Sequence, residues 1–210
     1  MNIVLEKKLE KLRTEVSSAV GKRIFHILAC EEECAELGKM AGFGEKELFD
    51  LRVSAILHDI THLLTFEEHL EFCKKRGIIP HEEFIKSPPT IHSLTGSVYA
   101  VEKYPELASG EVAQAIASHT VGRPNMTLSE KILCLADYAE KTRKYPACRE
   151  LRAWLWDNIT VDNAEDIINE ALYRYFINTE NHIKESGGHL NLLMLEAKKD
   201  LENKINQKNK

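Results

Sequence analysis

The sequence has few residues that break helices, with 10 glycines and 6 prolines among 210 residues. Turn-rich β-sandwiches use many such residues, so this scarcity favours long helices. No window approaches the roughly 18 consecutive apolar residues of a membrane span, and the N-terminus lacks the apolar segment of a signal peptide. The five cysteines are scattered and odd in number, which indicates reduced thiols rather than a disulfide framework. We therefore expect a cytoplasmic protein without a membrane partner.

The sequence also has no segment in which lysines and arginines are concentrated. The net charge is −5, and the lysines and arginines are spread along the chain. A protein that binds duplex nucleic acid needs a concentrated basic face for its phosphate contacts, so we expect no nucleic-acid partner. A small phosphorylated ligand is not excluded, because a metal ion can supply the positive charge locally.

Helical periodicity runs through most of the sequence. Apolar residues at helical spacing predict helices over about 2–19, 22–41, 45–58, 66–75, 91–104, 110–119, 128–141, 147–157, 163–184 and 188–205. Thr127 and Glu130 form a capping box at the start of the helix near 128. We expect an all-α fold with a single domain over 1–210 and a core over about 20–145. The C-terminal helices over 147–205 are expected to cover the functional site or to form a homodimer surface.

Several histidines and aspartates stand where apolar helices end. His58 and Asp59 follow the most apolar helix, His119 closes another apolar stripe, and Asp137 lies four residues after Leu133. A buried carboxylate needs a cation or several hydrogen-bond donors, because its desolvation is costly. Neutral imidazoles and carboxylates together form a mixed nitrogen and oxygen site for iron, manganese, cobalt or zinc. The sequence therefore predicts that these side chains meet around a divalent metal.

Other chemistry-bearing residues have simpler interpretations. Cys30 and Cys34 have a spacing that could hold zinc, but no second thiol pair completes a tetrahedral set, which favours small core residues. We interpret the acidic run at 31–33 as a solvated helix face. The remaining predictions concern single side chains: His69, His81 and His182 at the surface, and Trp154 and Trp156 in the packing of later helices.

The ordered set of histidines and aspartates on consecutive helices resembles the HD-domain phosphohydrolases. Five segments narrow the resemblance to the YqeK group: Lys22–His26, Ala55–Asp59, His92–Gly96, Ser118–Pro124 and Glu130–Tyr138. The match covers about residues 20–145 and is most specific from Ser118 to Tyr138. It implies an HD-domain helical bundle and an enzyme, a symmetrical bis(5'-nucleosyl)-tetraphosphatase that cuts diadenosine tetraphosphate into two ADP. It also implies one or two divalent ions, with iron foremost.

The resemblance carries roles over by position. It implies the metal ligands His26, His58, Asp59 and Asp137, with His92 and His119 binding a second metal or the phosphates. Substrate contacts are expected at Thr120, Gly122, Arg123, Asp137 and Arg143. Asp59 is then catalytic through the metal, His92 or His119 protonates the leaving phosphate, and the two arginines offset phosphate charge. The family usually has a lysine where this chain has His62, so a phosphate contact at this position stays open.

Two other function classes stay open at this point. One is an HD enzyme that acts on a nucleoside monophosphate, a cyclic nucleotide or guanosine tetraphosphate. The other is a non-catalytic HD module that binds nucleotide as a sensor. The complete ligand set counts against the sensor, because a degenerate module is expected to lose at least one ligand.

Overall fold

The computed structural model describes residues 2–108 and 110–208, and all regular elements in this part of the chain are helices. The α-helices are α1 (Ile3–Val20), α2 (Ile24–Met40), α3 (Glu45–Leu57), α4 (Phe66–Lys75), α5 (Glu82–Lys86), α6 (Ile91–Lys103), α7 (Glu111–Ser118), α8 (Leu128–Ala139), α9 (Pro146–Asn158), α10 (Ala164–Ser186) and α11 (Leu192–Lys208). Two short 3-10 turns, η1 (Gly21–Arg23) and η2 (Pro88–Thr90), precede α2 and α6. The all-α prediction is confirmed.

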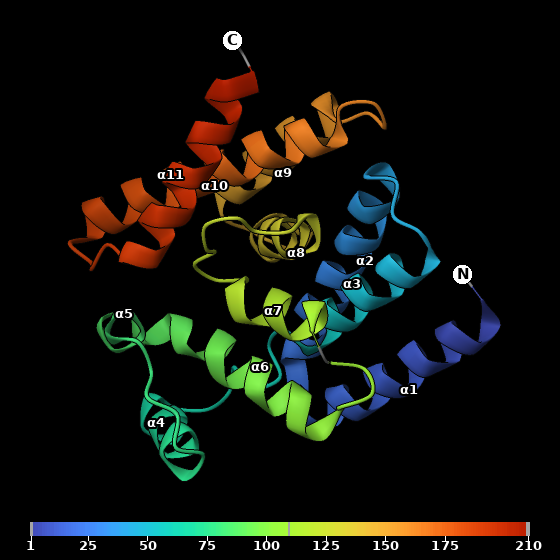
Figure 1. The fold of residues 1–210 in the computed structure, drawn as a ribbon, viewed down its shortest axis with the longest axis vertical. Coiled ribbons are helices and arrows are strands. Elements are labelled where there is room, and N and C mark those ends of the chain that lie inside the picture. The colour runs from blue at the N-terminus through green and yellow to red at the C-terminus, as the bar shows by residue number, and fades with distance from the viewer. Residues whose placement is uncertain (1, 109, 209–210) are drawn as a thin grey trace.

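Helix α8 lies in the middle of the molecule (Figure 1). It contacts α2, α3 and α7 on one side and α9 and α10 on the other. Its consecutive residues from Glu130 to Ala136 are all buried, because neighbours cover the helix around its circumference. The predicted capping box is confirmed: Thr127 accepts a hydrogen bond from the backbone of Glu130, whose side chain accepts one from the backbone of Thr127. A helix in this place can present a side chain to the elements on both sides.

The apolar core has two parts. One cluster joins α8 to the C-terminal helices and includes Leu133, Leu155 and Phe176. The other joins α1, α3 and α7 and includes Leu9, Ile56 and Ile116. The C-terminal helices therefore pack against the rest of the chain through a shared core.

A glycine turn sets the start of α2. Gly21 has a φ of 54°, a positive value that suits glycine, and it ends α1 between the two helices predicted over 2–19 and 22–41. The turn η1 follows, so α2 begins at Ile24 and His26 lies in its first helical turn. A further short helix, α5, lies in the segment that the sequence pattern leaves irregular.

Two buried acidic residues correct the prediction of a solvated acidic face. Glu31 and Glu33 are buried, and of this run only Glu32 is exposed. Glu31 accepts hydrogen bonds from Arg13 on α1 (2.7 Å) and from Arg52 on α3 (2.9 Å). The prediction was wrong because arginines on other helices compensate these carboxylates, and such pairing is not visible in the local sequence.

The second buried acid, Glu33, joins α2 to α9. Its carboxylate accepts hydrogen bonds from Arg152 (2.9 Å) and from the indole nitrogen of Trp156 (2.7 Å). Trp154 and Trp156 pack against the core cluster around α8, which confirms their predicted packing role. Both acidic residues therefore hold helices together rather than face solvent.

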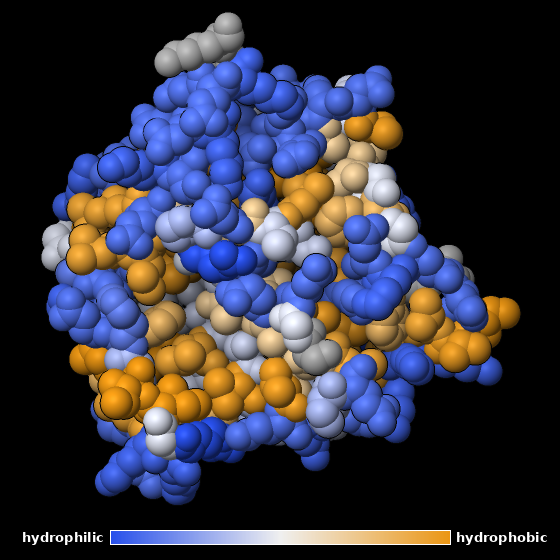
Figure 2. Space-filling model, in the orientation of Figure 1, coloured by the Kyte–Doolittle hydropathy of each residue, from blue (hydrophilic) through white to orange (hydrophobic). Residues whose placement is uncertain are grey.

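Hydrophobic side chains are exposed on the face of the molecule over α5 and α6 (Figure 2). Ile85 and Val101 on these helices are 43% and 39% exposed. In the described residues, no helix combines the length and apolar character that a membrane crossing requires.

Candidate metal centre

Five helices bring histidine and aspartate side chains to one place. His26 lies at the start of α2, His58 and Asp59 directly after α3, His92 at the start of α6, His119 directly after α7, and Asp137 on α8. His58, Asp59 and His119 have relative exposures of 0–1%. Two groups of side chains place their ligand atoms within 4.8 Å of one another: His26, Cys30, His58 and Asp137, and His58, Asp59 and His119.

Three imidazole rings of the cluster make the same hydrogen bond to the backbone. Each donates its Nδ1 hydrogen to a backbone carbonyl three residues earlier: His58 to Ala55 (2.7 Å), His92 to Pro89 (2.8 Å) and His119 to Ile116 (2.7 Å). In the neutral ring, the other nitrogen, Nε2, then carries a lone pair and no hydrogen. Backbone contacts of this kind orient histidine ligands in metal sites.

The Nε2 atoms of the cluster face one another. Those of His92 and His119 are 3.1 Å apart, and those of His26 and His58 are 3.3 Å apart. Two lone pairs at this distance repel unless a proton or a metal ion lies between them. Burial and the neighbouring rings of His58 and His92 lower the pKa of His119 to about 3. Its Nε2 therefore holds no proton at neutral pH, which favours a ligand role over an acid role for this residue.

His26 connects two carboxylates. Its Nδ1 lies 3.1 Å from a carboxylate oxygen of Glu140, and its Nε2 lies 3.0 Å from Oδ1 of Asp137. Burial opposes a charge on the ring, but the hydrogen bonds to Asp137 and Glu140 outweigh it and raise the pKa of His26. The contact with Glu140 leaves Nε2 directed at the cluster, as in carboxylate–histidine–metal arrangements.

Asp59 contains the oxygen atom that fits a metal most clearly. Its Oδ2 accepts a hydrogen bond from Arg23 (2.5 Å), whereas its Oδ1 is buried and has no hydrogen-bond partner among the described residues. Oδ1 lies 3.3 Å from Nε2 of His92, the nitrogen without a hydrogen. Burial raises the pKa of Asp59, but the rings of His58 and His92 outweigh it and hold the pKa well below its usual range. An ionised, buried oxygen without a donor is costly, and a divalent cation at this point would compensate it.

Asp137 is held from the opposite side by Arg143. The guanidinium donates to Oδ1 of Asp137 (2.6 Å) and to its backbone carbonyl (2.8 Å). Burial raises the pKa of Asp137, but His26, His58 and Arg143 together lower it. The Asp137 carboxylate therefore faces His26 within the cluster, and it faces the Arg143 cation at the edge of the cluster.

Three of the predicted substrate-binding residues lie in the loop between α7 and α8, where they make contacts within the protein. Nε and Nη2 of the Arg123 guanidinium donate to the two oxygens of the buried Glu130 carboxylate, each at 2.7 Å. Gly122 has a φ of 67°, and a Cβ at this position would come within 2.9 Å of Phe176. The hydroxyl of Thr120 donates to Ser93 (3.1 Å). In the structure, Arg123 and Gly122 hold this loop against α8 and the C-terminal helices.

Sequence reasoning assigned no role in the site to three residues that contact the ligand cluster. Arg23 and Glu140 bind Asp59 and His26, and the Cys30 thiol lies 3.4 Å from Nε2 of His26. Arg23 lies in a segment that resembles the family and Glu140 lies two residues beyond another, but their partners are 36 and 114 residues away along the chain. No local pattern could have identified these pairs. Cys30 is buried, as predicted for a small core residue. Its burial raises the pKa of the thiol well above its usual value.

Two recesses adjoin the cluster. One, here called the apolar recess, has a volume of about 300 Å³ and is lined by His62, Leu64, Phe66, His69, Pro88, Pro89 and His92. The other, here called the cationic recess, has a volume of about 200 Å³ and is lined by Glu140, Lys141, Arg143, Arg149, Arg152 and Ala153. Each recess shares at least one lining residue with the cluster or its direct partners.

His69, in the apolar recess, is buried, so its predicted surface position was wrong. Its Nδ1 is 2.8 Å from the hydroxyl of Thr95, which in turn lies 3.0 Å from the hydroxyl of Thr61. Its acidic sequence neighbours suggested exposure, but α4 packs against α6 and turns this ring inward. His81 and His182 are exposed, as predicted.

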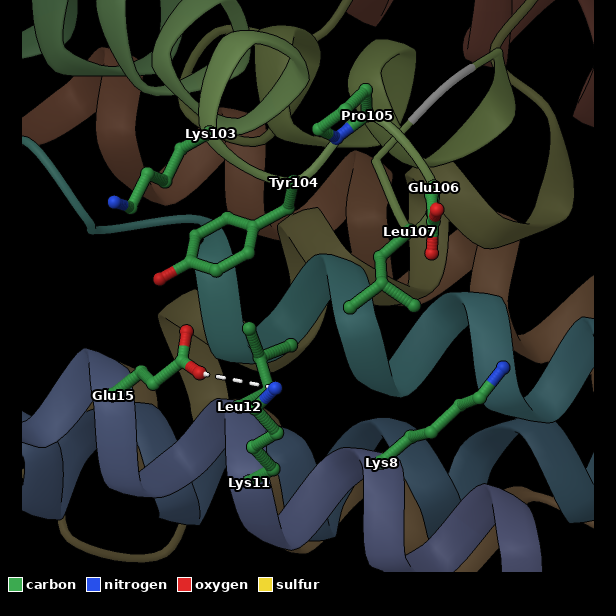
Figure 3. Close-up of a pocket in the computed structure, with 9 residues that line it drawn as sticks. All are labelled: Lys8, Lys11, Leu12, Glu15, Lys103, Tyr104, Pro105, Glu106 and Leu107. Carbon is green, nitrogen blue, oxygen red and sulfur yellow. Dashed lines mark ion pairs between the residues drawn. The ribbon is translucent and has the colours of Figure 1, made fainter.

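A third recess, of about 420 Å³, lies between α1 and the end of α6 (Figure 3). Lysines surround its apolar floor, and the amino group of Lys11 lies 3.8 Å from Glu15. None of its lining residues belongs to the candidate metal centre.

Comparison with known proteins agrees with this geometry. Residues 23–142 match the HD domain family. A symmetrical bis(5'-nucleosyl)-tetraphosphatase of Halalkalibacterium halodurans is 27% identical over 157 residues, which are 75% of this chain and 76% of that protein. The same-named protein of Bacillus subtilis is 29% identical over 157 residues, 75% of this chain and 77% of its own length.

A solved structure is similar over nearly the whole chain. It is the crystal structure of a predicted HD superfamily hydrolase involved in NAD metabolism from Clostridium acetobutylicum. It superimposes with a TM-score of 0.79 at 28% identity and covers 93% of this chain and 97% of that one. The resemblance read from the sequence is confirmed, and the chain belongs to the HD domain family.

Proposed function

We propose that this HD-domain hydrolase cleaves dinucleoside polyphosphates, and that it converts diadenosine tetraphosphate into two ADP. The observation that carries the proposal is the buried cluster of inward-facing imidazole nitrogens and carboxylates around the unpartnered Oδ1 of Asp59. The names of the similar proteins from H. halodurans and B. subtilis support this choice of substrate.

His26, His58, Asp59 and Asp137 are the proposed ligands of a divalent metal, and iron is the ion that we expect. His92 and His119 are proposed to hold a second ion or the phosphates. A bound divalent ion lowers the pKa of water and offsets charge on the attacked phosphoryl group. The four donor residues suit such an ion because they combine neutral imidazole nitrogens with ionised oxygens.

The other residues of the site position the substrate and balance its charge. Phosphoryl transfer requires mostly positioning and electrostatic stabilisation. Arg143, with its guanidinium at the edge of the cluster, is placed to contact phosphate oxygens, since its planar fork suits them. Arg23 holds Asp59 in place through a hydrogen bond to its Oδ2. The apolar recess offers Phe66 and two prolines as surfaces for a nucleoside base.

Product analysis tests the proposed function directly. The purified protein is incubated with diadenosine tetraphosphate and each of iron, manganese, cobalt and zinc, and the nucleotides are separated by ion-exchange chromatography. Two ADP per substrate is the expected result. ATP plus AMP would contradict symmetrical cleavage, and turnover of nucleoside monophosphates or cyclic nucleotides alone would favour another HD reaction. Tight nucleotide binding without turnover with any metal would refute an enzymatic function.

A further inference from the structure

The cationic recess contains four basic side chains beside the candidate metal centre. Lys141 and Arg143 follow α8, and Arg149 and Arg152 lie on α9. Arg143 joins the recess to the cluster, because its guanidinium also donates to Asp137 at 2.6 Å. A ligand that reaches Arg143 from the cluster therefore lies at the entrance of this recess.

Most of the cations in the recess already have acidic partners. Lys141 forms an ion pair with Glu32, and Arg152 binds Glu33 at 2.9 Å. Arg149 differs: it is exposed, and within the described residues its guanidinium has no hydrogen-bond or ion-pair partner. It is the cation of the recess whose charge no neighbour balances.

The one carboxylate that lines the recess does not cancel this charge. Glu140 has a relative exposure of 1%, and its oxygens accept from His26 (3.1 Å), from the Thr142 hydroxyl (2.7 Å) and from the Thr142 backbone. Glu140 also lies 3.7 Å from Nε of Arg143, and none of these contacts involves Arg149. The open part of the recess is therefore positively charged through Arg149, with Arg143 at its inner end.

We propose, on the basis of the proposed function, that the cationic recess binds the phosphates of the substrate that lie beyond the bond to be cleaved. Arg149 is the positioning residue of this subsite. Each further phosphate group adds negative charge, and a guanidinium binds phosphate oxygens in pairs. The recess therefore favours substrates with long phosphate chains over nucleoside monophosphates. The single phosphate of a monophosphate would bind at the cluster itself and leave no phosphate for the recess.

The test compares Arg149→Gln with Arg174→Gln, a control with the same charge change. Arg174 lies on α10 outside the recess, and its side chain is 46% exposed and paired with Glu170. We expect Arg149→Gln to raise KM for diadenosine tetraphosphate about fivefold with little change in kcat, as for a partly screened charge contact. Arg174→Gln should leave both constants unchanged. The increase in KM should shrink at 1 M salt, because salt screens exposed charges.

A second measurement separates this subsite from the proposed function. Inorganic tripolyphosphate is titrated into each purified protein in a calorimeter, and Arg149→Gln should bind it about fivefold more weakly than the unaltered chain. If no dinucleoside polyphosphate is cleaved but this difference in binding is found, the proposed function fails and the phosphate subsite stands. If cleavage occurs and Arg149→Gln matches the unaltered chain in KM and in tripolyphosphate affinity, the subsite is refuted. Equal losses in Arg149→Gln and Arg174→Gln would also overturn it, since they would show a general effect of charge.

Discussion

Glu140 offers a graded test of how the protein supports its proposed metal ligands. The carboxylate is buried and receives the Nδ1 hydrogen of His26 at 3.1 Å, which directs Nε2 at the cluster. Burial raises the pKa of Glu140, but His26 and Thr142 outweigh it and lower the pKa, so the residue is ionised at neutral pH. Replacing it removes the charge that makes the His26 nitrogen a stronger donor to a metal.

The expected loss of metal affinity depends on whether the substitution keeps a hydrogen-bond acceptor for His26. Glu140→Gln keeps an oxygen that can accept from His26 and loses only the charge, so we expect about tenfold weaker metal binding. Glu140→Ala removes the acceptor as well, and we expect about 100-fold weaker binding, or roughly 2.7 kcal/mol. Competition with a chromophoric chelator for cobalt or zinc measures both values.

Glu130→Gln is the matched control. Glu130 is also buried, but its partners are Arg123, the Ser118 hydroxyl and the N-terminus of α8. This variant should lower the melting temperature and leave the metal affinity unchanged. The reasoning is refuted if Glu140→Ala binds metal as tightly as the unaltered chain, or if Glu130→Gln weakens binding to the same extent.

Three further predictions concern buried positions. Burial lowers the pKa of His69 to about 4, so its contribution to stability is present above pH 6.5 and is lost as the pH falls toward 4. His69→Gln should flatten this part of the stability curve, by at most about 3 kcal/mol, in urea unfolding at several pH values; an unchanged slope would contradict it. Gly122→Ala should cost about 2 kcal/mol or more in the same assay, because φ is 67° and Phe176 is 2.9 Å from the added Cβ; a neutral result would show that the loop adapts. Cys30→Ala should keep the full metal content, because the buried thiol stays protonated; loss of metal would identify the sulfur as a ligand.

The sequence was informative where an ionisable side chain stands among apolar residues of the same helix. His58, His119 and Asp137 stand at apolar helix ends or beneath an apolar turn, and a polar group in such a place predicts a partner. The structure does place these side chains together. The all-α fold follows for a similar reason, because helical periodicity and capping act over a few neighbouring residues.

Contacts between distant helices could not be predicted in this way. Glu31 has an acidic sequence neighbourhood, yet Arg13 and Arg52 from two other helices make its burial tolerable. The orientation of His26 depends on Glu140, 114 residues further along the chain. Such pairs depend on how helices pack, which single-helix patterns do not encode.

Metal analysis of protein purified without chelators tests the central claim most directly. If imidazoles and carboxylates from five helices hold a divalent ion, the unaltered chain should contain at least one equivalent of a transition metal. Asp59→Ala should lose most of that metal and its hydrolytic activity while its circular dichroism spectrum stays helical. A metal-free unaltered chain that still hydrolyses its substrate, or an Asp59→Ala variant with full metal content, would contradict the account.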